Sequence, residues 1–343
     1  MSRIEVTKLK EVSSQILVAS GVPTEDAQII TDTILDAHKK GRHSHGIGRL
    51  SIYIRKINSG QMNAETIVKT VSQTPIISIL DANNGFGQVA AYKGMSNCIK
   101  VASEHGIGVA TVKNSNSFGS AGYFGEMATK QNMIGVVMGN ASPALAPQGG
   151  SKAILGTNPI CFSFPGTDEH PSIVLDMACS VAARGKIRLA AKNGEKIPLD
   201  WAKDADGNPT DDPTLAILGS LNPIGDYKGF GLALVVDIMA GLLSGAAFGG
   251  DVKALNTPSG FSNYGHFLAA LNPDFFLSRK EYNKRLDYLI NNIKYSGETG
   301  AIFMPGERSH IQEMQSTDYV DLPSKIIRDI NDIALEFQLS EKL

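Results

Sequence analysis

Residues 41–50 combine the side chains that proton transfer and carboxylate binding require. They include His43, Ser44, His45 and Arg49 on a backbone with three glycines. An imidazole titrates near neutral pH, and a guanidinium holds a carboxylate through two hydrogen bonds. The spacing therefore predicts a pocket for a small carboxylated substrate. In it His45 exchanges a proton, Ser44 orients the imidazole or the substrate, and Arg49 holds the carboxylate.

Helical patterns lead into and out of this segment. Apolar residues recur at helical spacing in residues 9–19 and 27–37, and a third helix is expected to follow. In that third helix Tyr53 lies one turn beyond Arg49 and shares its face. Residues 1–75 are accordingly predicted to form an N-terminal helical substrate-binding segment.

Strand and helix patterns alternate from residue 76 onward. Such alternation predicts an α/β fold with a mixed sheet and flanking helices. We expect residues 76–255 to form an α/β cofactor-binding domain and residues 256–343 to return and complete the fold. One buried helix is expected over residues 229–249. The expected strands are residues 76–80, 107–112, 133–138, 160–164, 173–175, 265–271 and 301–304.

A glycine motif between the first of these strands and its helix resembles a dinucleotide-binding turn. Residues 85–90 read G-x-G-x-x-A, the pattern of a Rossmann phosphate loop. An acidic residue that holds the ribose is expected after the next strand, but Lys113 and Asn114 stand there. The sequence therefore favours a packing role for these glycines over an ordinary Rossmann site.

Composition excludes several classes of function. The net charge is −2 without a basic stripe, so no nucleic-acid partner is expected. The apolar stretch 229–249 contains Asp237 and several glycines, which favours a buried helix over a membrane span. Three cysteines without a C-x-x-C pair fit reduced thiols in a cytoplasmic protein. His43 and His45 have no third ligand at useful spacing, so no metal is expected.

Six blocks in order carry a family resemblance. They are residues 43–49, 83–88 (NNGFGQ), 114–119 (NSNSFG), 156–159 (GTNP), 176–178 (DMA) and 228–231 (KGFG). Together they resemble the type-2 malate/L-lactate dehydrogenase family, with its ureidoglycolate and sulfolactate dehydrogenases, diketogulonate reductase and cyclic imino-acid reductases. The resemblance covers nearly the whole chain. It implies a non-Rossmann malate/L-lactate dehydrogenase-like fold, NAD or NADP as cofactor, and a homodimer with the active site near the subunit contact.

The resemblance also implies roles for single residues. Ser44 and His45 match the catalytic pair, and Arg49, Tyr53 and Thr157 match substrate-binding positions. The cofactor-binding positions that it implies are Ser117, Asp176, Met177, Ala178, Lys228, Gly229, Pro305 and Gly306. Residue type further suggests that Asp176 pairs with His45 across the pocket. Independently of any family, a lysine at a helix start such as Lys228 favours phosphate.

One residue departs from the family pattern. Ser117 stands where members usually carry a histidine, and serine does not titrate near neutral pH. The leading interpretation remains an NAD(P)-dependent oxidoreductase that interconverts a small 2-hydroxy acid and its 2-oxo acid. Malate/oxaloacetate comes first, with lactate/pyruvate or sulfolactate also open. The alternatives are a ureidoglycolate or cyclic imino-acid type of reductase, or a catalytically impaired dinucleotide-binding dimer.

Overall fold

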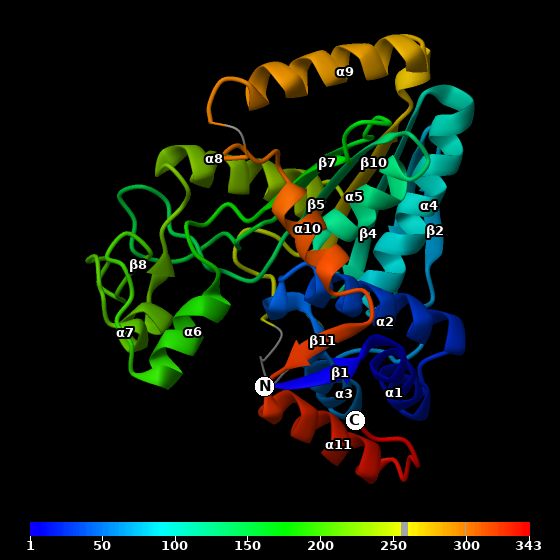
Figure 1. Ribbon diagram of the computed structural model, residues 1–343. Coiled ribbons are helices and arrows are strands. Elements are labelled where there is room, and N and C mark those ends of the chain that lie inside the picture. The colour runs from blue at the N-terminus through cyan, green and yellow to red at the C-terminus, as the bar shows by residue number, and fades with distance from the viewer. Residues whose placement is uncertain (255–259, 299) are drawn as a thin grey trace.

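A seven-stranded mixed sheet forms the centre of the protein (Figure 1). The computed structural model describes residues 1–254, 260–298 and 300–343. Along the sheet the strand order is β2-β3-β4-β10-β5-β6-β7. The strands are β2 (Lys69–Gln73), β3 (Ile77–Asp81), β4 (Ile107–Ser115), β5 (Ile134–Gly139), β6 (Ile160–Phe164), β7 (Ile173–Met177) and β10 (Tyr264–Leu271).

The pairing pattern makes this sheet mixed, as the sequence predicts. β3 and β4 run parallel and are joined by α4 (Gly87–His105), while β10 runs antiparallel to both β4 and β5. β10 comes from the C-terminal part of the chain but enters the middle of the sheet. The sheet is therefore completed late in the sequence, and its strand order cannot be read from the order of the elements.

Helices cover both faces of the sheet. Successive side chains of a strand point to opposite faces, and β5 shows this. Val137 packs in the core beneath α4 and α5 (Ala121–Thr129), whereas Met138 packs with α8 (Tyr227–Val236) and the π-helical turn η3 (Asp237–Leu242). Each face thus has its own apolar core.

The two ends of the chain meet in a separate helical layer. β1 (Ser2–Glu5) pairs with β11 (Tyr319–Leu322), and α11 (Ser324–Glu336) packs against the N-terminal helices (Figure 1). These helices are α1 (Val6–Ala19), α2 (Thr24–Lys39) and α3 (Leu50–Asn58). A buried apolar core runs through this layer, which includes Leu9, Ile16 and Ile30. It supports the turns η1 (His43–His45) and η2 (Ile47–Arg49) between α2 and α3.

A smaller lobe lies beside the sheet, in green in Figure 1. It consists of α6 (Arg184–Asn193), α7 (Pro213–Leu218) and the paired strands β8 (Ala202–Lys203) and β9 (Ser220–Leu221). The remaining elements are the turn η4 (Pro273–Phe275) and the helices α9 (Arg279–Lys294) and α10 (Glu307–Gln315).

Some expected elements differ in the structure. The strand expected at 301–304 is absent, because the Met304 amide donates to the Glu307 carboxylate (2.8 Å) at the start of α10 instead of to a sheet neighbour. In place of the single helix expected over 229–249, the structure has α8 followed by η3, and η3 ends at Leu242. β2 was not predicted, because its exposed sequence KTVSQ lacks the alternation of a half-buried strand. Among the described helices, none has the length and apolar character to cross a membrane.

Candidate active site

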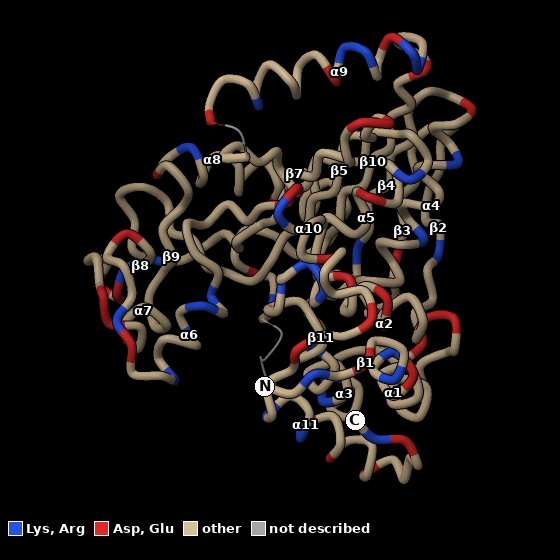
Figure 2. The backbone as a smooth tube through the Cα atoms, viewed as in Figure 1, with Lys and Arg blue, Asp and Glu red and all other residues tan. Residues whose placement is uncertain are grey.

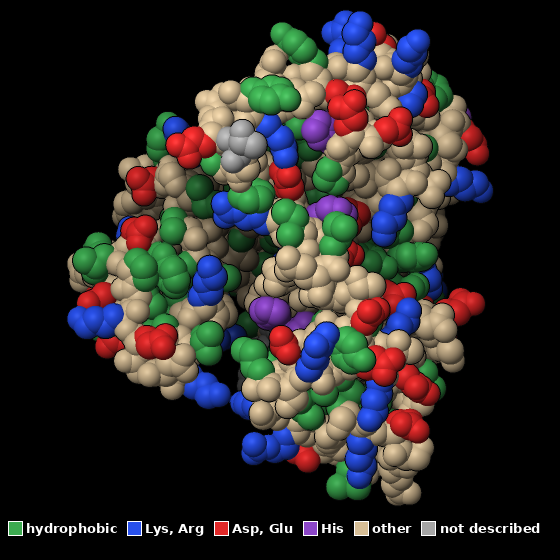
Figure 3. All heavy atoms as spheres, in the orientation of Figure 1, with side chains coloured by type: hydrophobic (Ala, Val, Ile, Leu, Met, Phe, Trp, Pro, Cys, Tyr) green, Lys and Arg blue, Asp and Glu red, His purple; other side chains and the backbone are tan. Residues whose placement is uncertain are grey.

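A cavity of about 430 Å³ lies between the helical layer, the end of the sheet and the small lobe. Figure 3 shows a hollow beside that lobe, with histidine side chains (purple) at its edge. A Cβ atom at Gly185, at the start of α6, would lie 3.6 Å from Ser44 Cβ, so the two walls approach closely. Of the residues predicted from sequence, those that line the cavity are Ser44, His45, Arg49, Ser117, Thr157 and Ala178.

The charges around this cavity are of one sign. Arg49 borders it from the helical layer, and Arg184 and Arg188 border it from α6. Of the described residues, no Asp or Glu lines it. Figure 2 marks Lys and Arg positions (blue) on α6 and on the segment that faces it. Unpaired guanidiniums on opposite walls make the cavity suited to a small anion.

His45 is held by its neighbours in η1 and η2. Its Nδ1 lies 3.0 Å from the Ser44 hydroxyl oxygen, and Arg49 Nε donates to the Ser44 carbonyl (2.6 Å). Burial lowers the pKa of His45 to about 4, and the positive charge of Arg49 contributes to this. No local pattern predicts this shift from the ordinary value of about 6.5. The imidazole is therefore neutral at pH 7.

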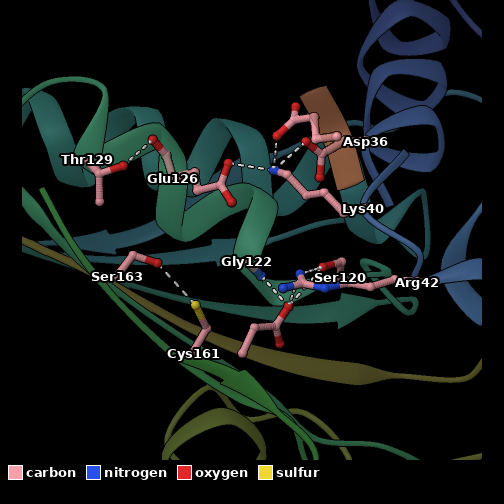
Figure 4. A network of polar contacts seen from close by, with 11 residues as sticks. Asp36, Lys40, Arg42, Ser120, Gly122, Glu126, Thr129, Cys161 and Ser163 are labelled. Atoms are coloured by element: carbon pink, nitrogen blue, oxygen red, sulfur yellow. Dashed lines mark hydrogen bonds and ion pairs between the residues drawn. The ribbon is translucent and has the colours of Figure 1, made fainter. Parts of the chain in front are cut away.

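Asp176 has partners other than the one expected. Its Oδ2 accepts from Arg42 (2.5 Å), the Ser120 hydroxyl (2.9 Å) and the Gly122 amide (2.8 Å). Figure 4 shows Arg42, Ser120 and Gly122 close together. The predicted pairing with His45 is wrong, because the Arg42 guanidinium and the start of α5 already satisfy this carboxylate. Asp176 acts on His45 only at longer range, as a negative charge that opposes the lowering of its pKa.

Tyr53 lies behind the cavity wall. It is buried, and its hydroxyl accepts a hydrogen bond of 2.6 Å from Gln88 Nε2 of α4. Its ring meets Phe86 edge to face, with the centroids 5.6 Å apart. Burial raises the pKa of Tyr53, so the phenol stays protonated. Tyr53 lies one helical turn beyond Arg49 but does not line the cavity.

The other predicted cofactor residues are spread out. Lys228 is exposed at the start of α8, whereas Gly229 is buried where a Cβ atom would lie 2.5 Å from the Ile224 backbone. Pro305 accepts a hydrogen bond from the Val174 amide in β7 (2.9 Å). Met177, at the end of β7, is half-buried and packs beside the core of α8 and η3.

A second cavity of about 500 Å³ lies beyond Arg42 and is bordered by Gly306. It differs in its charges, because Lys40, Arg42 and Lys130 share it with the acids Glu126, Asp168, Glu169 and Glu313. Lys40 is almost fully buried and pairs with Glu126 (2.6 Å) and with Asp36 (2.7 Å) (Figure 4).

The imidazoles of His43 and His45 contact different partners. The His43 ring packs on His38, with centroids 4.5 Å apart, while His45 contacts Ser44. Elsewhere, Glu169, His170 and Asp287 place their ligand atoms within 4.8 Å of one another. Thr167 already donates to Asp287 (2.6 Å), and this group lies at the second cavity.

Sequence reasoning missed three groups at the first cavity. Arg188 and Tyr264 line it, and so does His266 of β10, which is completely buried. Burial lowers the pKa of His266 to about 4. No local signal marks these residues. Tyr264 and His266 reach the cavity because β10 lies between β4 and β5, and Arg188 reaches it from α6 of the small lobe.

Comparison with known proteins gives a consistent result. Residues 4–331 match the model of the malate/L-lactate dehydrogenase family. The malate/(S)-sulfolactate dehydrogenase of Methanothermus fervidus is 38% identical over 326 residues, which cover 95% of each chain. The NAD(+) ureidoglycolate dehydrogenase of Escherichia coli O157:H7 is 31% identical and covers 92% of this chain and 90% of its own.

A solved structure agrees with the predicted fold class. The sulfolactate dehydrogenase from Methanocaldococcus jannaschii superposes with a TM-score of 0.92 at 37% identity, over 98% of both chains. The non-Rossmann α/β fold expected from the sequence is thereby confirmed.

Proposed function

This chain belongs to the malate/L-lactate dehydrogenase family, and from that premise we propose that it interconverts a small 2-hydroxy acid and its 2-oxo acid with NAD or NADP. As a family member it is an oxidoreductase of the hydroxy-acid dehydrogenase type. Malate and oxaloacetate are the leading pair. One observation carries the proposal: Arg49, Arg184 and Arg188 border the cavity beside a neutral histidine, and no carboxylate is among the described residues that line it.

The residues present leave room for a nicotinamide. Gly119, Gly139 and Ala178 line the cavity, and side chains this small permit close approach of a flat ring. A reduced nicotinamide bound there would supply a hydride to the carbonyl carbon of the substrate. We assign Ser117 and Ala178 to this end of the cofactor. Asp176, Met177, Lys228, Gly229, Pro305 and Gly306 are proposed for the rest of it.

Proton transfer falls to His45. When Nδ1 carries the hydrogen and donates it to Ser44, Nε2 is left as an acceptor for the hydroxyl proton of the 2-hydroxy acid. In the reverse direction the protonated ring returns that proton to the developing alkoxide. A substrate carboxylate bound to Arg49 offsets the repulsion that this guanidinium exerts on His45. Binding therefore offsets one cause of the lowered pKa of His45, while burial, the larger cause, remains.

The arrangement of the arginines favours a substrate with two acid groups. Arg49 supplies a cation on one wall, and Arg184 and Arg188 supply cations on the other. Oxaloacetate, or a 2-oxo acid with a sulfonate, suits cations on both walls better than pyruvate, which carries one acid group. Thr157 lines the same cavity and is proposed as a substrate contact. Tyr53 is proposed to hold Arg49 in place from behind.

A panel of substrates tests the proposal. NADH and NADPH oxidation is followed with oxaloacetate, sulfopyruvate, pyruvate and a cyclic imino acid, and NAD+ and NADP+ reduction with ureidoglycolate. We expect the dianionic 2-oxo acids to give the highest kcat/KM. Preferred turnover of the imino acid or ureidoglycolate would favour the alternative substrate class, for which the ureidoglycolate relative is the support. Cofactor binding without turnover of any compound would instead favour the catalytically impaired dimer. That alternative rests on Ser117, which replaces the histidine usual in the family.

Assembly and location complete the proposal. Apolar side chains of α8 and η3, among them Leu234, Val235 and Leu242, are exposed, which supports a homodimer with this face near the contact. Sedimentation analysis at micromolar concentration tests it. The three cysteines are free and buried, which supports a reducing compartment, the cytoplasm. We also retain the division at residues 75 and 255 as a proposal.

A further inference from the structure

The glycine motif of α4 packs against the segment that carries Ser117. A Cβ atom at Gly87 would lie 2.0 Å from the Asn116 carbonyl oxygen, so only glycine permits this approach. Asn116 Nδ2 donates to the Gly85 carbonyl (2.8 Å) and to the Asn84 carbonyl (3.1 Å). These glycines receive a neighbouring backbone rather than a phosphate, which agrees with the packing role predicted for them.

A buried lysine holds the other side of this segment. Lys56 lies on the same face of α3 as Tyr53 and donates to Asn116 Oδ1 (2.7 Å) and to the Ser262 hydroxyl (2.7 Å). The two donations by Asn116 Nδ2 fix the amide, so its oxygen has to face the ammonium group. Both partners of Lys56 are neutral, and no ion pair joins it to a described Asp or Glu.

His266 fixes the backbone of the same segment. Its Nε2 lies 3.0 Å from the Asn116 carbonyl oxygen and therefore carries the hydrogen. Its ring meets Phe118 edge to face, with the centroids 4.8 Å apart. Ser117 lies between these two anchored residues and lines the cavity. Its position thus depends on contacts that α3, α4 and β10 make with its neighbours.

A buried, unpaired ammonium group is costly for stability. Removing a charge from water without an opposite charge beside it is unfavourable, and a well-packed apolar side chain of similar size is often neutral or better. Lys56 is nevertheless only 4% exposed. We propose that Lys56 is a positioning residue of the active site, whose side chain ties Asn116 to Ser262 and so keeps Ser117 directed into the cavity. This inference rests on the proposed function for its kinetic consequences.

Three variants test the proposal. Lys56→Met removes the donor, Lys56→Arg keeps a cationic donor, and Arg55→Met changes an exposed residue on the same helix as the matched control. We expect Lys56→Met to lower kcat/KM for the preferred 2-oxo acid by about 10- to 100-fold, since small displacements of positioning groups have effects of that size. The melting temperature should stay within about 3 °C of wild type. Lys56→Arg should recover most of the kinetic loss.

Several outcomes would overturn the inference. Turnover by Lys56→Met within about 3-fold of wild type would do so, since that is less than 1 kcal/mol. So would a loss that only tracks a lower melting temperature. Hydrogen exchange of the peptide covering residues 115–120 supplies a readout without turnover. It should rise in Lys56→Met and not in Arg55→Met. If wild type reduces no acid, the proposed function fails, and exchange alone decides on Lys56; equal exchange in both variants would reject it.

Discussion

The two cavities are similar in volume, about 430 and 500 Å³, but they differ in whether their charged side chains have partners of opposite sign. In the first, three arginines lie without acidic partners among the described residues. In the second, Lys40 pairs closely with Asp36 and Glu126, and Arg42 pairs with Asp176. Paired charges hold a structure together, whereas unpaired charges of one sign are left to hold a ligand. Chemistry is therefore indicated by which charges remain unpaired and not by the volume of a cavity.

The largest expected effect is on proton transfer in the first cavity. His45→Asn keeps a polar side chain but removes the group that exchanges the proton. We expect kcat to fall about 10²- to 10⁴-fold, while NADH affinity, measured by fluorescence, stays within about 3-fold. Turnover near the wild-type level would remove His45 from the mechanism.

The second cavity should respond in stability instead. Burial alone would lower the pKa of Lys40, but Asp36 and Glu126 outweigh it, and the pKa is raised. Lys40→Met leaves these carboxylates without their partner. We expect the free energy of unfolding in urea to fall by about 3–5 kcal/mol, with the KM for the acid unchanged in the folded enzyme. A changed KM at unchanged stability would contradict the division between the cavities.

Lys56 gives a pH signature of its own. Burial lowers its pKa from 10.5 to about 8. Between these two values the unfolded chain binds a proton that the folded protein does not, so stability rises with pH through this window. Compared with Lys56→Met, wild type should gain roughly 3 kcal/mol from pH 7.5 to 10.5. Parallel stability curves for the two proteins would show that Lys56 titrates normally.

A smaller effect is expected at Arg49. Arg49→Lys keeps the charge but loses the planar fork that binds a carboxylate in two places. The KM for the 2-oxo acid should rise about 10-fold, with kcat changed less. If the KM is unaltered, Arg49 does not contact the substrate carboxylate.

Sequence reasoning reached the parts of the site that are local in the chain. Ser44, His45 and Arg49 lie within two short turns, so their spacing alone brings them together. The alternation of strands and helices likewise predicted the α/β class. Local patterns carry this information because neighbouring residues are held together by the backbone.

The rest of the site depends on contacts between distant segments. His266 and Arg188 reach the cavity through the strand order and through the small lobe, which no local pattern encodes. The sequence suggested His45 as the partner of Asp176, because residue type alone does not show which basic side chain lies nearer. In the structure Arg42 is the partner. Lys56, seven residues beyond Arg49, was not singled out, because its partners Asn116 and Ser262 lie far from it in the sequence.

A structure with the cofactor and oxalate bound tests the difference between the cavities most directly. Oxalate resembles a small 2-oxo acid, but it has no ketone group to reduce, so it is not turned over. We predict that it lies in the first cavity, with one carboxylate on Arg49 and an oxygen within hydrogen-bond distance of His45 Nε2. Oxalate bound in the second cavity, or His45 and Arg49 turned away from it toward solvent, would contradict the account.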